Sequence, residues 1–346
     1  MKALLKYALE ADRVEVRDIP DPRAGAGRVL LRVQAAGVCG SDLHMWHNTH
    51  SWAITLPLVL GHEFSAVVEE VGAGVDGFAP GDRVTCETAA SVCGRCAYCV
   101  SGHYNLCPER KGYGALIDGV FSEFVVARPV ILHHLPENVS FEQAALTEPI
   151  CVAYNALVEK SEIRPGDTVV IQGPGPIGML ALLIALARGA APVIMLGTGV
   201  DRRRLAKARE LGAHHAIDIQ AQDPAELLRG IDDGLGAHLV VDCTGVSAAL
   251  QQSMDLVRPN GQITKIGWGP QPLGVSLDPL VAKAATLQGC FSHTHGTWER
   301  VLKLMAAQQL NLDAVVGGVY PLDAWREAFA DMGSGANVKS VLLLDA

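Results

Sequence analysis

The chain has 346 residues, a length that suits two domains of ordinary size at about 150 residues each. Hydrophobic residues make up 49% and charged residues 19%, so the chain has enough apolar material for a core and lacks the composition of a disordered protein. Acidic residues outnumber basic ones by 37 to 28, and a net charge of -9 leaves no overall positive field for binding nucleic acid.

The first part of the chain, residues 1–151, has short β-type segments interrupted by Gly and Pro. This pattern predicts an irregular, mostly antiparallel β domain. The predicted strands are Val29–Gln34, Phe64–Val71, Arg83–Cys86 and Ser122–Ala127.

Two glycine-flanked segments of this domain carry possible metal ligands, Cys39 in one and His62-Glu63 in the other. The pair is not the zinc-protease helix motif, because Ala66 stands where the second His is required. A single Cys or His is more often a packed core residue than a ligand, so spacing alone does not decide their role.

Four of the nine cysteines fall within 15 residues, in a lobe that we place at residues 86–110. Four thiolates this close can surround one tetrahedral ion. A structural zinc is favoured over an iron–sulfur cluster or disulfides, because the chain shows no signal peptide and is expected to be cytoplasmic. The four are Cys93, Cys96, Cys99 and Cys107.

Residues 152–290 change to apolar strands that alternate with helical stretches, the pattern of a doubly wound parallel sheet. One predicted helix, Ile177–Arg188, is apolar nearly all round, but its longest apolar run is far below the roughly 20 residues that cross a bilayer. We therefore expect a soluble protein with no membrane partner. The predicted strands are Val169–Ile171, Val193–Leu196, Ala216–Ile219, Leu239–Val241, Ile263–Ile266 and Thr286–Cys290.

A glycine-rich turn joins the first of these strands to the apolar helix, as a dinucleotide site requires. Gly173 permits the tight turn, Gly175 lets the backbone approach a pyrophosphate, and Gly178 lets helix and strand pack closely. Pro176 and Ile177 belong to the same turn and are expected to lie at the cofactor, where the helix N-terminus offers amides to phosphate oxygens. The turn therefore predicts a nicotinamide dinucleotide cofactor.

The tail, residues 291–346, contains helical segments at Trp298–Met305 and Leu322–Met332 and a closing strand at Ser340–Leu344. Six strands already complete the cofactor sheet, so we expect this tail to return to the first domain.

Taken together, these motifs resemble the zinc-dependent medium-chain dehydrogenases over essentially the whole chain. The matching segments are Cys39–His44, Gly61-His62-Glu63, Gly81–Val84, the cysteine lobe and the turn at 173–178. One departure is Ala66, where the family usually has Gly. The resemblance implies a GroES-like catalytic domain and a Rossmann cofactor domain, an α/β fold with two zinc ions per subunit.

The resemblance also implies the catalytic zinc ligands. Thr147-Glu148-Pro149 is similar to the polyol (sorbitol) dehydrogenase branch, in which a Glu replaces a second Cys, so the ligands are expected to be Cys39, His62 and Glu148. Their charges balance Zn²⁺, and the fourth position stays open. Glu63 is expected to be a neighbouring carboxylate that holds the zinc-bound water or exchanges with a ligand; a simple ion pair is its alternative role.

In the implied reaction a secondary alcohol, from a polyol or sugar, and its ketone are interconverted by hydride transfer. Ser41 and His44 match the family's proton relay. Amino-alcohol oxidation of the threonine dehydrogenase type and reduction of a bulkier ketone remain alternatives within enzymes. A catalytically idle binding protein is the alternative outside them, disfavoured because no catalytic position is lost.

The end of the second cofactor strand lacks the acidic residue that NAD-using relatives carry. Gly199 stands there after Thr198, and Arg202, Arg203 and Arg204 follow. An arginine here can pair with a 2′-phosphate, which favours NADP over NAD, although Asp201 can reach the ribose if the loop is displaced.

Thr286–Cys290, as an edge strand, is expected to join subunits into a homodimer or homotetramer.

Overall fold

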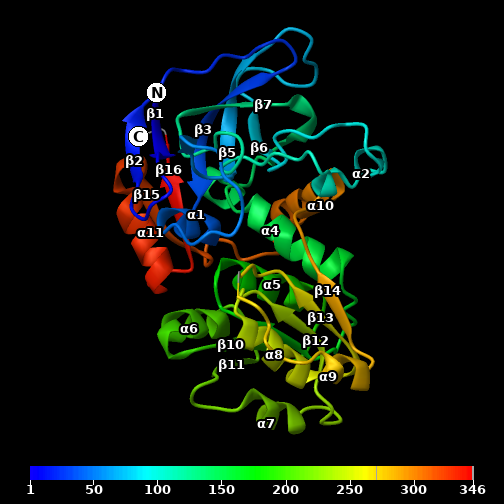
Figure 1. The fold of residues 1–346 in the computed structure, drawn as a ribbon. Helices are drawn as coiled ribbons and strands as arrows, with labels where there is room; N and C mark the ends of the chain where they lie inside the picture. Colours follow the sequence, from blue (N-terminus) through cyan, green and yellow to red (C-terminus); the bar gives the residue numbers. More distant parts are fainter. Residues whose placement is uncertain (270, 345–346) are drawn as a thin grey trace.

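A parallel sheet of six strands forms the cofactor domain in the computed structural model, which describes residues 1–269 and 271–344 (Figure 1). Its strand order, β11-β10-β9-β12-β13-β14, confirms the predicted doubly wound sheet. The strands are β9 (Val169–Gln172), β10 (Val193–Gly197), β11 (His215–Asp218), β12 (Ala237–Asp242), β13 (Val257–Lys265) and β14 (Thr286–Gly289).

Helices cover both faces of this sheet because its strands are apolar on both sides. The first, α5, follows the glycine turn as predicted, although it begins and ends one residue earlier than the predicted Ile177–Arg188, and it is buried from Gly178 to Ala185. The helices are α5 (Pro176–Ala187), α6 (Arg202–Glu210), α7 (Pro224–Arg229), α8 (Ser247–Leu256) and α9 (Asp278–Ala282).

The catalytic domain is built on a sheet in which all four predicted strands occur, and they pair antiparallel. The order is β15-β16-β3-β5-β6-β8, with β7 also paired to β3. The strands are β3 (Val29–Gly37), β5 (Glu63–Val71), β6 (Arg83–Cys86), β7 (Phe124–Ala127), β8 (Leu132–His134), β15 (Val316–Pro321) and β16 (Lys339–Leu343).

A second small sheet in this domain, of order β2-β1-β4, was not predicted from the sequence. It joins the amino-terminal residues to the segment just before His62. Its strands are β1 (Lys2–Lys6), β2 (Val14–Asp18) and β4 (Leu58–Val59).

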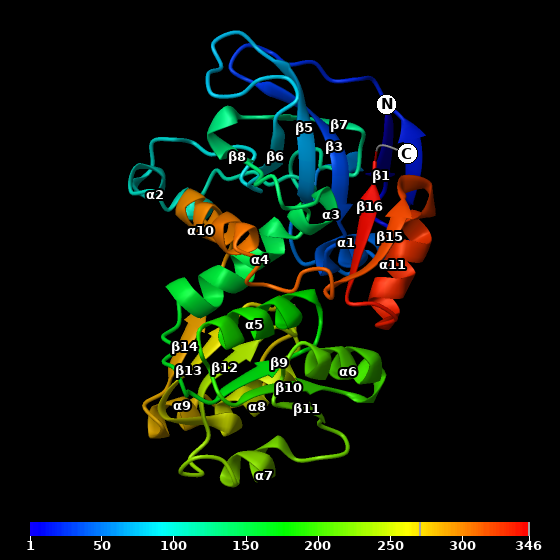
Figure 2. The same cartoon turned by 180° about the vertical axis from the view of Figure 1, so that it is seen from behind.

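The carboxyl-terminal segment lies in the catalytic domain, where β16 pairs antiparallel with β3, Val341 opposite Gly37 (Figure 2). The unpredicted strand β15 runs parallel to β16. The helices of this domain are α1 (Gly40–Trp46), α2 (Ala97–Val100), α3 (Phe141–Ala144), α4 (Thr147–Tyr154), α10 (His295–Ala306) and α11 (Trp325–Ser334).

The two domains meet along α4, which contacts β5 on one side and α5 of the cofactor domain on the other. The predicted boundary between residues 151 and 152 therefore falls inside a helix. One buried apolar cluster includes residues of α4, α5 and α10, so the core is continuous across this junction. No helix among the described residues is both long and apolar enough to span a bilayer.

Candidate active site and metal centres

Asp42 fixes the two segments that carry Cys39 and His62. Its carboxylate accepts a hydrogen bond from the Cys39 backbone N–H at 2.9 Å and another from the Gly61 N–H at 3.2 Å. Asp42 is completely buried at the third position of α1, where an acidic side chain caps the helix. Sequence reasoning missed this residue, although the capping-box position was a usable signal.

The structure brings Cys39, His62 and Glu63 together, with their ligand atoms within 4.8 Å of one another. Burial lowers the pKa of His62, but the hydrogen bond and charge of Cys39, with Asp42 and Glu148, outweigh it and raise the pKa to about 10. The surrounding anionic groups thus favour a positive charge at this point. One Cys, one His and a carboxylate are suitable ligands for Zn²⁺.

Glu63 is also paired with Lys339, whose ammonium group bonds directly to Glu63 Oε2. Each of these side chains is only 1% exposed. Burial lowers the pKa of Lys339, yet the charge of Glu63 outweighs it and keeps the ammonium protonated. Lys339 lies 276 residues from Glu63 along the chain, and no sequence signal pointed to it.

Glu148 lies on α4 and does not join the group formed by Cys39, His62 and Glu63. Its Oε1 is 2.9 Å from Nε2 of His293, and Nδ1 of His293 accepts a hydrogen bond from Trp298 Nε1 at 2.7 Å. With Nδ1 as acceptor, the neutral imidazole donates from Nε2. Burial raises the pKa of Glu148, but His293, with the charge of His62, outweighs it and lowers the pKa.

The two predicted relay residues lie one turn apart on α1. Ser41 Oγ is buried and has no hydrogen-bond partner among the described residues, a polar atom that a substrate hydroxyl can satisfy. His44 is exposed, and its Nδ1 is 3.0 Å from Thr49 Oγ1. The pair thus connects a buried hydroxyl to the solvent-facing side of the helix.

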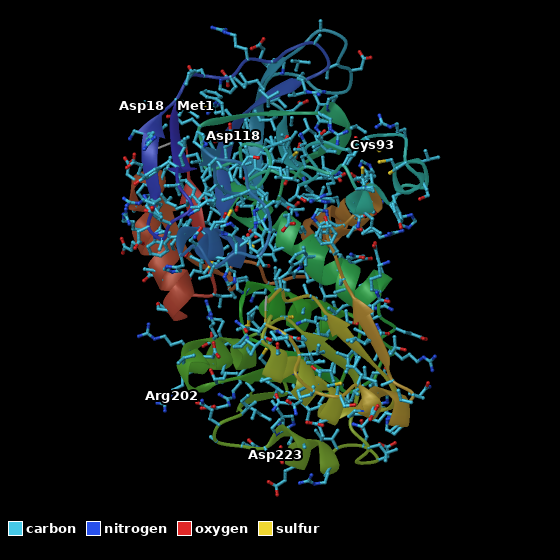
Figure 3. All side chains as sticks on the ribbon, viewed as in Figure 1. Met1, Asp18, Cys93, Asp118, Arg202 and Asp223 are labelled. Atoms are coloured by element: carbon cyan, nitrogen blue, oxygen red, sulfur yellow. The ribbon has the colours of Figure 1, made fainter. Side chains whose placement is uncertain are left out.

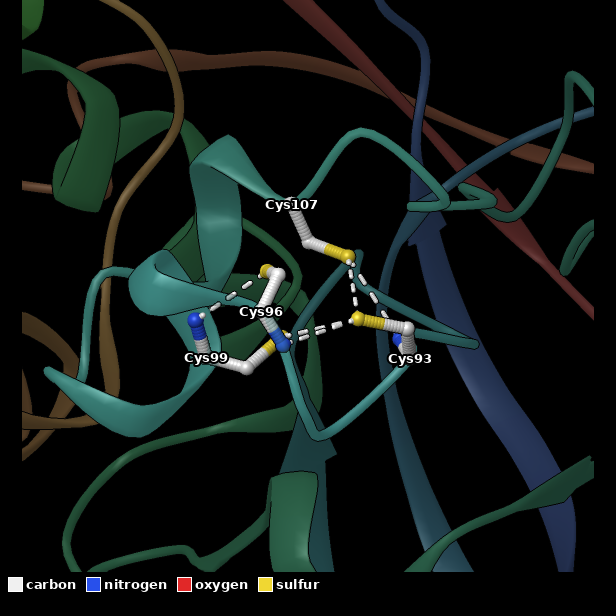
Figure 4. A group of neighbouring side chains, drawn as sticks. All are labelled: Cys93, Cys96, Cys99 and Cys107. Atoms are coloured by element: carbon white, nitrogen blue, oxygen red, sulfur yellow. Dashed lines mark hydrogen bonds between the residues drawn. The ribbon is translucent and has the colours of Figure 1, made fainter.

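The four cysteines of the lobe point toward one centre (Figure 4). Cys93 Sγ lies 3.9 Å from Cys99 Sγ and 3.6 Å from Cys107 Sγ. Tetrahedral ligands at the usual zinc–sulfur bond length are about 3.8 Å apart, so these separations fit one ion. Backbone N–H groups of Arg95 and Cys96 lower the pKa of Cys93 to about 6, which favours the thiolate.

This lobe lies at the outer edge of the catalytic domain, where Figure 3 labels Cys93, well away from Arg202 in the cofactor domain. All nine cysteines are free thiols, so no disulfide takes the place of a metal.

The glycine turn has the geometry of a phosphate cradle. Gly173 adopts a φ of +91°, and a Cβ on Gly178 would lie 1.9 Å from the Gly173 carbonyl oxygen. A Cβ on Gly175 would meet nothing within 4 Å, so this position is open to a ligand. Helix α5 begins directly after the turn, and backbone amides at a helix N-terminus bind phosphate oxygens, so the arrangement fits a dinucleotide pyrophosphate.

The residues after β10 that are predicted to bind the adenosine ribose differ from one another in their contacts. Asp201 Oδ2 accepts hydrogen bonds from both N–H and Oγ1 of Thr198, at 3.0 Å each. Arg204 donates to the carbonyl oxygens of Asn337 and Met332, so it joins the two domains. Arg202 and Arg203 are exposed, and a Cβ on Gly199 would lie 3.4 Å from Asp218 Oδ2.

Comparison with known proteins agrees with this geometry. Residues 25–137 match the alcohol dehydrogenase GroES-like domain, and residues 176–307 match the zinc-binding dehydrogenase family. The chain is 40% identical to a sorbitol dehydrogenase of Halalkalibacterium halodurans over 99% of each chain. It is 38% identical to a D-arabitol-phosphate dehydrogenase of Enterococcus avium, covering 99% of this chain and 97% of the relative.

A solved structure, the alcohol dehydrogenase TADH from Thermus sp. ATN1, superposes with a TM-score of 0.90 at 30% identity over 99% of each chain. The chain therefore belongs to the zinc-dependent medium-chain dehydrogenases. Within them it falls in the branch that contains polyol and threonine dehydrogenases, as an oxidoreductase that acts on alcohols with zinc and a nicotinamide cofactor. The predicted family, fold class and reaction class are confirmed.

Proposed function

We propose that the protein interconverts a secondary hydroxyl of a polyol or sugar-derived alcohol and its ketone, with a catalytic zinc held by Cys39, His62 and Glu148. The observation that carries this proposal is the pair of buried carboxylates beside the Cys39–His62 pair. The charge of Glu63 is already balanced by Lys339. Glu148 is held by an imidazole in its neutral form, and its own charge remains available to a metal.

Cys39, His62 and Glu148 would hold the zinc, which would supply Lewis acidity toward an alcohol oxygen, and the glycine turn would hold the nicotinamide cofactor that supplies the hydride acceptor. Ser41 Oγ, whose hydrogen-bonding capacity is unfilled, accepts the hydroxyl proton. His44 passes the proton to solvent from the exposed side of α1. Glu63 Oε1 lies 3.9 Å from Nε2 of His62, and in this proposal the carboxylate orders the polar groups beside that imidazole.

We also propose a second, structural zinc on Cys93, Cys96, Cys99 and Cys107. The sulfur separations support it, as does the lowered pKa of Cys93. A closed four-sulfur site has no open position for substrate. A cytoplasmic location agrees with the free thiols of such a lobe.

For the cofactor we propose that NADP is used at least as well as NAD. Support comes from Gly199 at the position of the usual acid and from the exposed guanidinium of Arg202. Asp218, which faces Gly199 from β11, works against a 2′-phosphate. Asp218→Ala should therefore raise kcat/KM with NADP relative to NAD, and a much higher kcat/KM with NAD in the parent protein would contradict the proposal.

A homodimer or homotetramer is proposed through β14, which lies at the edge of the cofactor sheet. Leu287 on this strand is 40% exposed. Light scattering that finds only a species of 36.6 kDa would dispose of this assignment.

A second candidate substrate is a ketone or alcohol with a large apolar group. A row of aromatic rings crosses from one domain to the other, with Trp52 6.3 Å from Trp268 and Trp268 5.8 Å from Phe291. Trp268 is 58% exposed and Phe291 is 40% exposed, so their rings can cover an apolar ligand.

Steady-state turnover with polyols, sugar phosphates, amino alcohols and aryl ketones, each with both cofactors, tests the substrate class. Glu148→Ala should lose turnover and catalytic zinc together. Cys151→Ala, which changes a buried thiol on the same helix, is the matched control and should retain both. The reverse result would make Cys151 a ligand and overturn the assignment of Glu148.

A further inference from the structure

A third group of possible metal ligands lies outside both predicted zinc sites. Glu87 directly follows β6, His133 is on β8, and His295 begins α10. One ligand atom from each lies within 4.8 Å of the other two. The catalytic mechanism uses none of these residues.

The separations suit a shared ion. Glu87 Oε1 is 3.2 Å from His133 Nε2 and 3.6 Å from His295 Nδ1. The second distance is too long for a hydrogen bond. Tetrahedral oxygen and nitrogen ligands at zinc bond lengths are about 3.3–3.4 Å apart, close to both values.

Neighbouring residues hold two of the three ligands in place. Glu299 Oε1 lies 2.6 Å from Nδ1 of His133, so this carboxylate can accept the Nδ1 proton. Nε2, which lies 3.2 Å from Glu87 Oε1, then carries no proton and can bind a metal together with that carboxylate. Metal-binding histidines are usually oriented by such a carboxylate. Tyr104 donates to Glu87 Oε2 at 2.6 Å and accepts from the His295 backbone N–H at 2.6 Å.

The group is buried on one side and open on the other. The side chains of Glu87 and His133 are at most 1% exposed, and the His133 ring is stacked on Trp298 with an interplanar angle of 8°. The side chain of His295 is 55% exposed, so an ion can reach the group from solvent.

We propose that Glu87, His133 and His295 form a third metal site, which binds a divalent transition ion of the zinc, cobalt or nickel class. Two imidazoles and one carboxylate are a suitable ligand set for these ions, and the fourth position is left to water. The ion links the ends of β6 and β8 to α10, which lies beside the cysteine lobe (Figures 1 and 2). His293, the partner of Glu148, lies two residues before His295.

The test starts from enzyme that holds two zinc ions per subunit by metal analysis, so that the third site is still empty. This enzyme is titrated with Co²⁺ and followed by visible absorption and by metal analysis after desalting. We expect one cobalt per subunit to bind in addition to the zinc already present. Its spectrum should lack a thiolate-to-cobalt charge-transfer band, because the site contains no sulfur.

Three variants assign the ion to this group. His295→Gln removes a ligand and should weaken cobalt binding at least tenfold. Glu299→Gln removes the carboxylate that orients His133 and should weaken it about 10–100-fold. His134→Gln changes an exposed histidine next to His133 and should leave binding unchanged.

The proposal is overturned if no additional cobalt binds, or if His295→Gln binds cobalt as tightly as the parent does. It is also overturned if cobalt only replaces zinc and a thiolate-to-cobalt band appears, because cobalt is then at a cysteine site. Because His295 and Glu299 are substantially exposed, both variants are expected to fold, which circular dichroism checks. The additional ion is counted above the resident zinc, so this result is separate from the proposed alcohol oxidation.

Discussion

Lys339→Met should destabilise the catalytic domain strongly, because it removes the positive partner of Glu63. Both side chains are 1% exposed, so neither charge can be solvated by water. Removing one partner of a buried pair typically costs about 3–5 kcal/mol. Met nearly preserves the volume of Lys, and the charge that remains on Glu63 is therefore the main source of the loss.

In the variant Glu63 can take up a proton instead of staying charged. The loss in free energy of unfolding therefore cannot exceed the free energy of protonating Glu63, which depends on pH. In the variant, the folded-state pKa of Glu63 lies above its unfolded value of about 4.3, so the penalty grows as pH rises above that value. At about 1.36 kcal/mol per pH unit, the ceiling is about 3.7 kcal/mol at pH 7 and about 1.6 kcal/mol at pH 5.5. The variant should therefore approach the parent in stability as pH falls.

Urea unfolding of the zinc-loaded protein at the two pH values measures this difference. The double variant with Glu63→Gln should be more stable at pH 7 than Lys339→Met alone, and its penalty should not depend on pH. Lys2→Met is the matched control, since its ion pair with Asp323 is exposed to solvent and should contribute little to stability. A pH-independent loss in Lys339→Met, or a double variant weaker than the single one, would refute the reasoning.

Three further outcomes are expected. Cys99→Ser should lower the unfolding midpoint because metal binding in the lobe is linked to folding. Cys39→Ala should mainly abolish turnover, and equal behaviour of the two variants would contradict separate structural and catalytic roles. Trp298→Phe removes the donor to His293 and should weaken catalytic zinc binding about 10–100-fold by competition with a chelator, and unchanged affinity would exclude a positioning role. Gly178→Ala should prevent fluorescence-detected binding of the reduced cofactor, since the new Cβ would overlap a carbonyl oxygen; normal binding would mean that the turn is not the cradle.

The cofactor domain was predictable because its strands are short apolar runs and its first helix follows a glycine turn of fixed spacing. Strand β15 was missed because Val316–Pro321 contains two glycines and alternates between partly buried and exposed positions. Strand β4 has only two residues and is recognised only through its pairing with β1, which joins Leu5 to Val59, while β1 itself pairs mainly with β2.

The four lobe cysteines were predictable as a site because they lie within 15 residues of each other. The Glu63–Lys339 and Glu148–His293 contacts were not, since they join residues that are 276 and 145 positions apart. A local motif cannot specify which distant side chain will neutralise or orient a buried carboxylate. That information is present only in the pairing of β16 with β3 and in the packing of α10 on α4.

The position of β16 has a consequence for the order in which the domains fold during synthesis. The cofactor sheet is formed by consecutive residues from Val169 to Gly289, so it can assemble as soon as that stretch has left the ribosome. The catalytic sheet begins much earlier in the chain but stays incomplete until Lys339–Leu343 emerge. Until then Glu63 lacks the ammonium group of Lys339, and the domain translated first is therefore the one that is finished last.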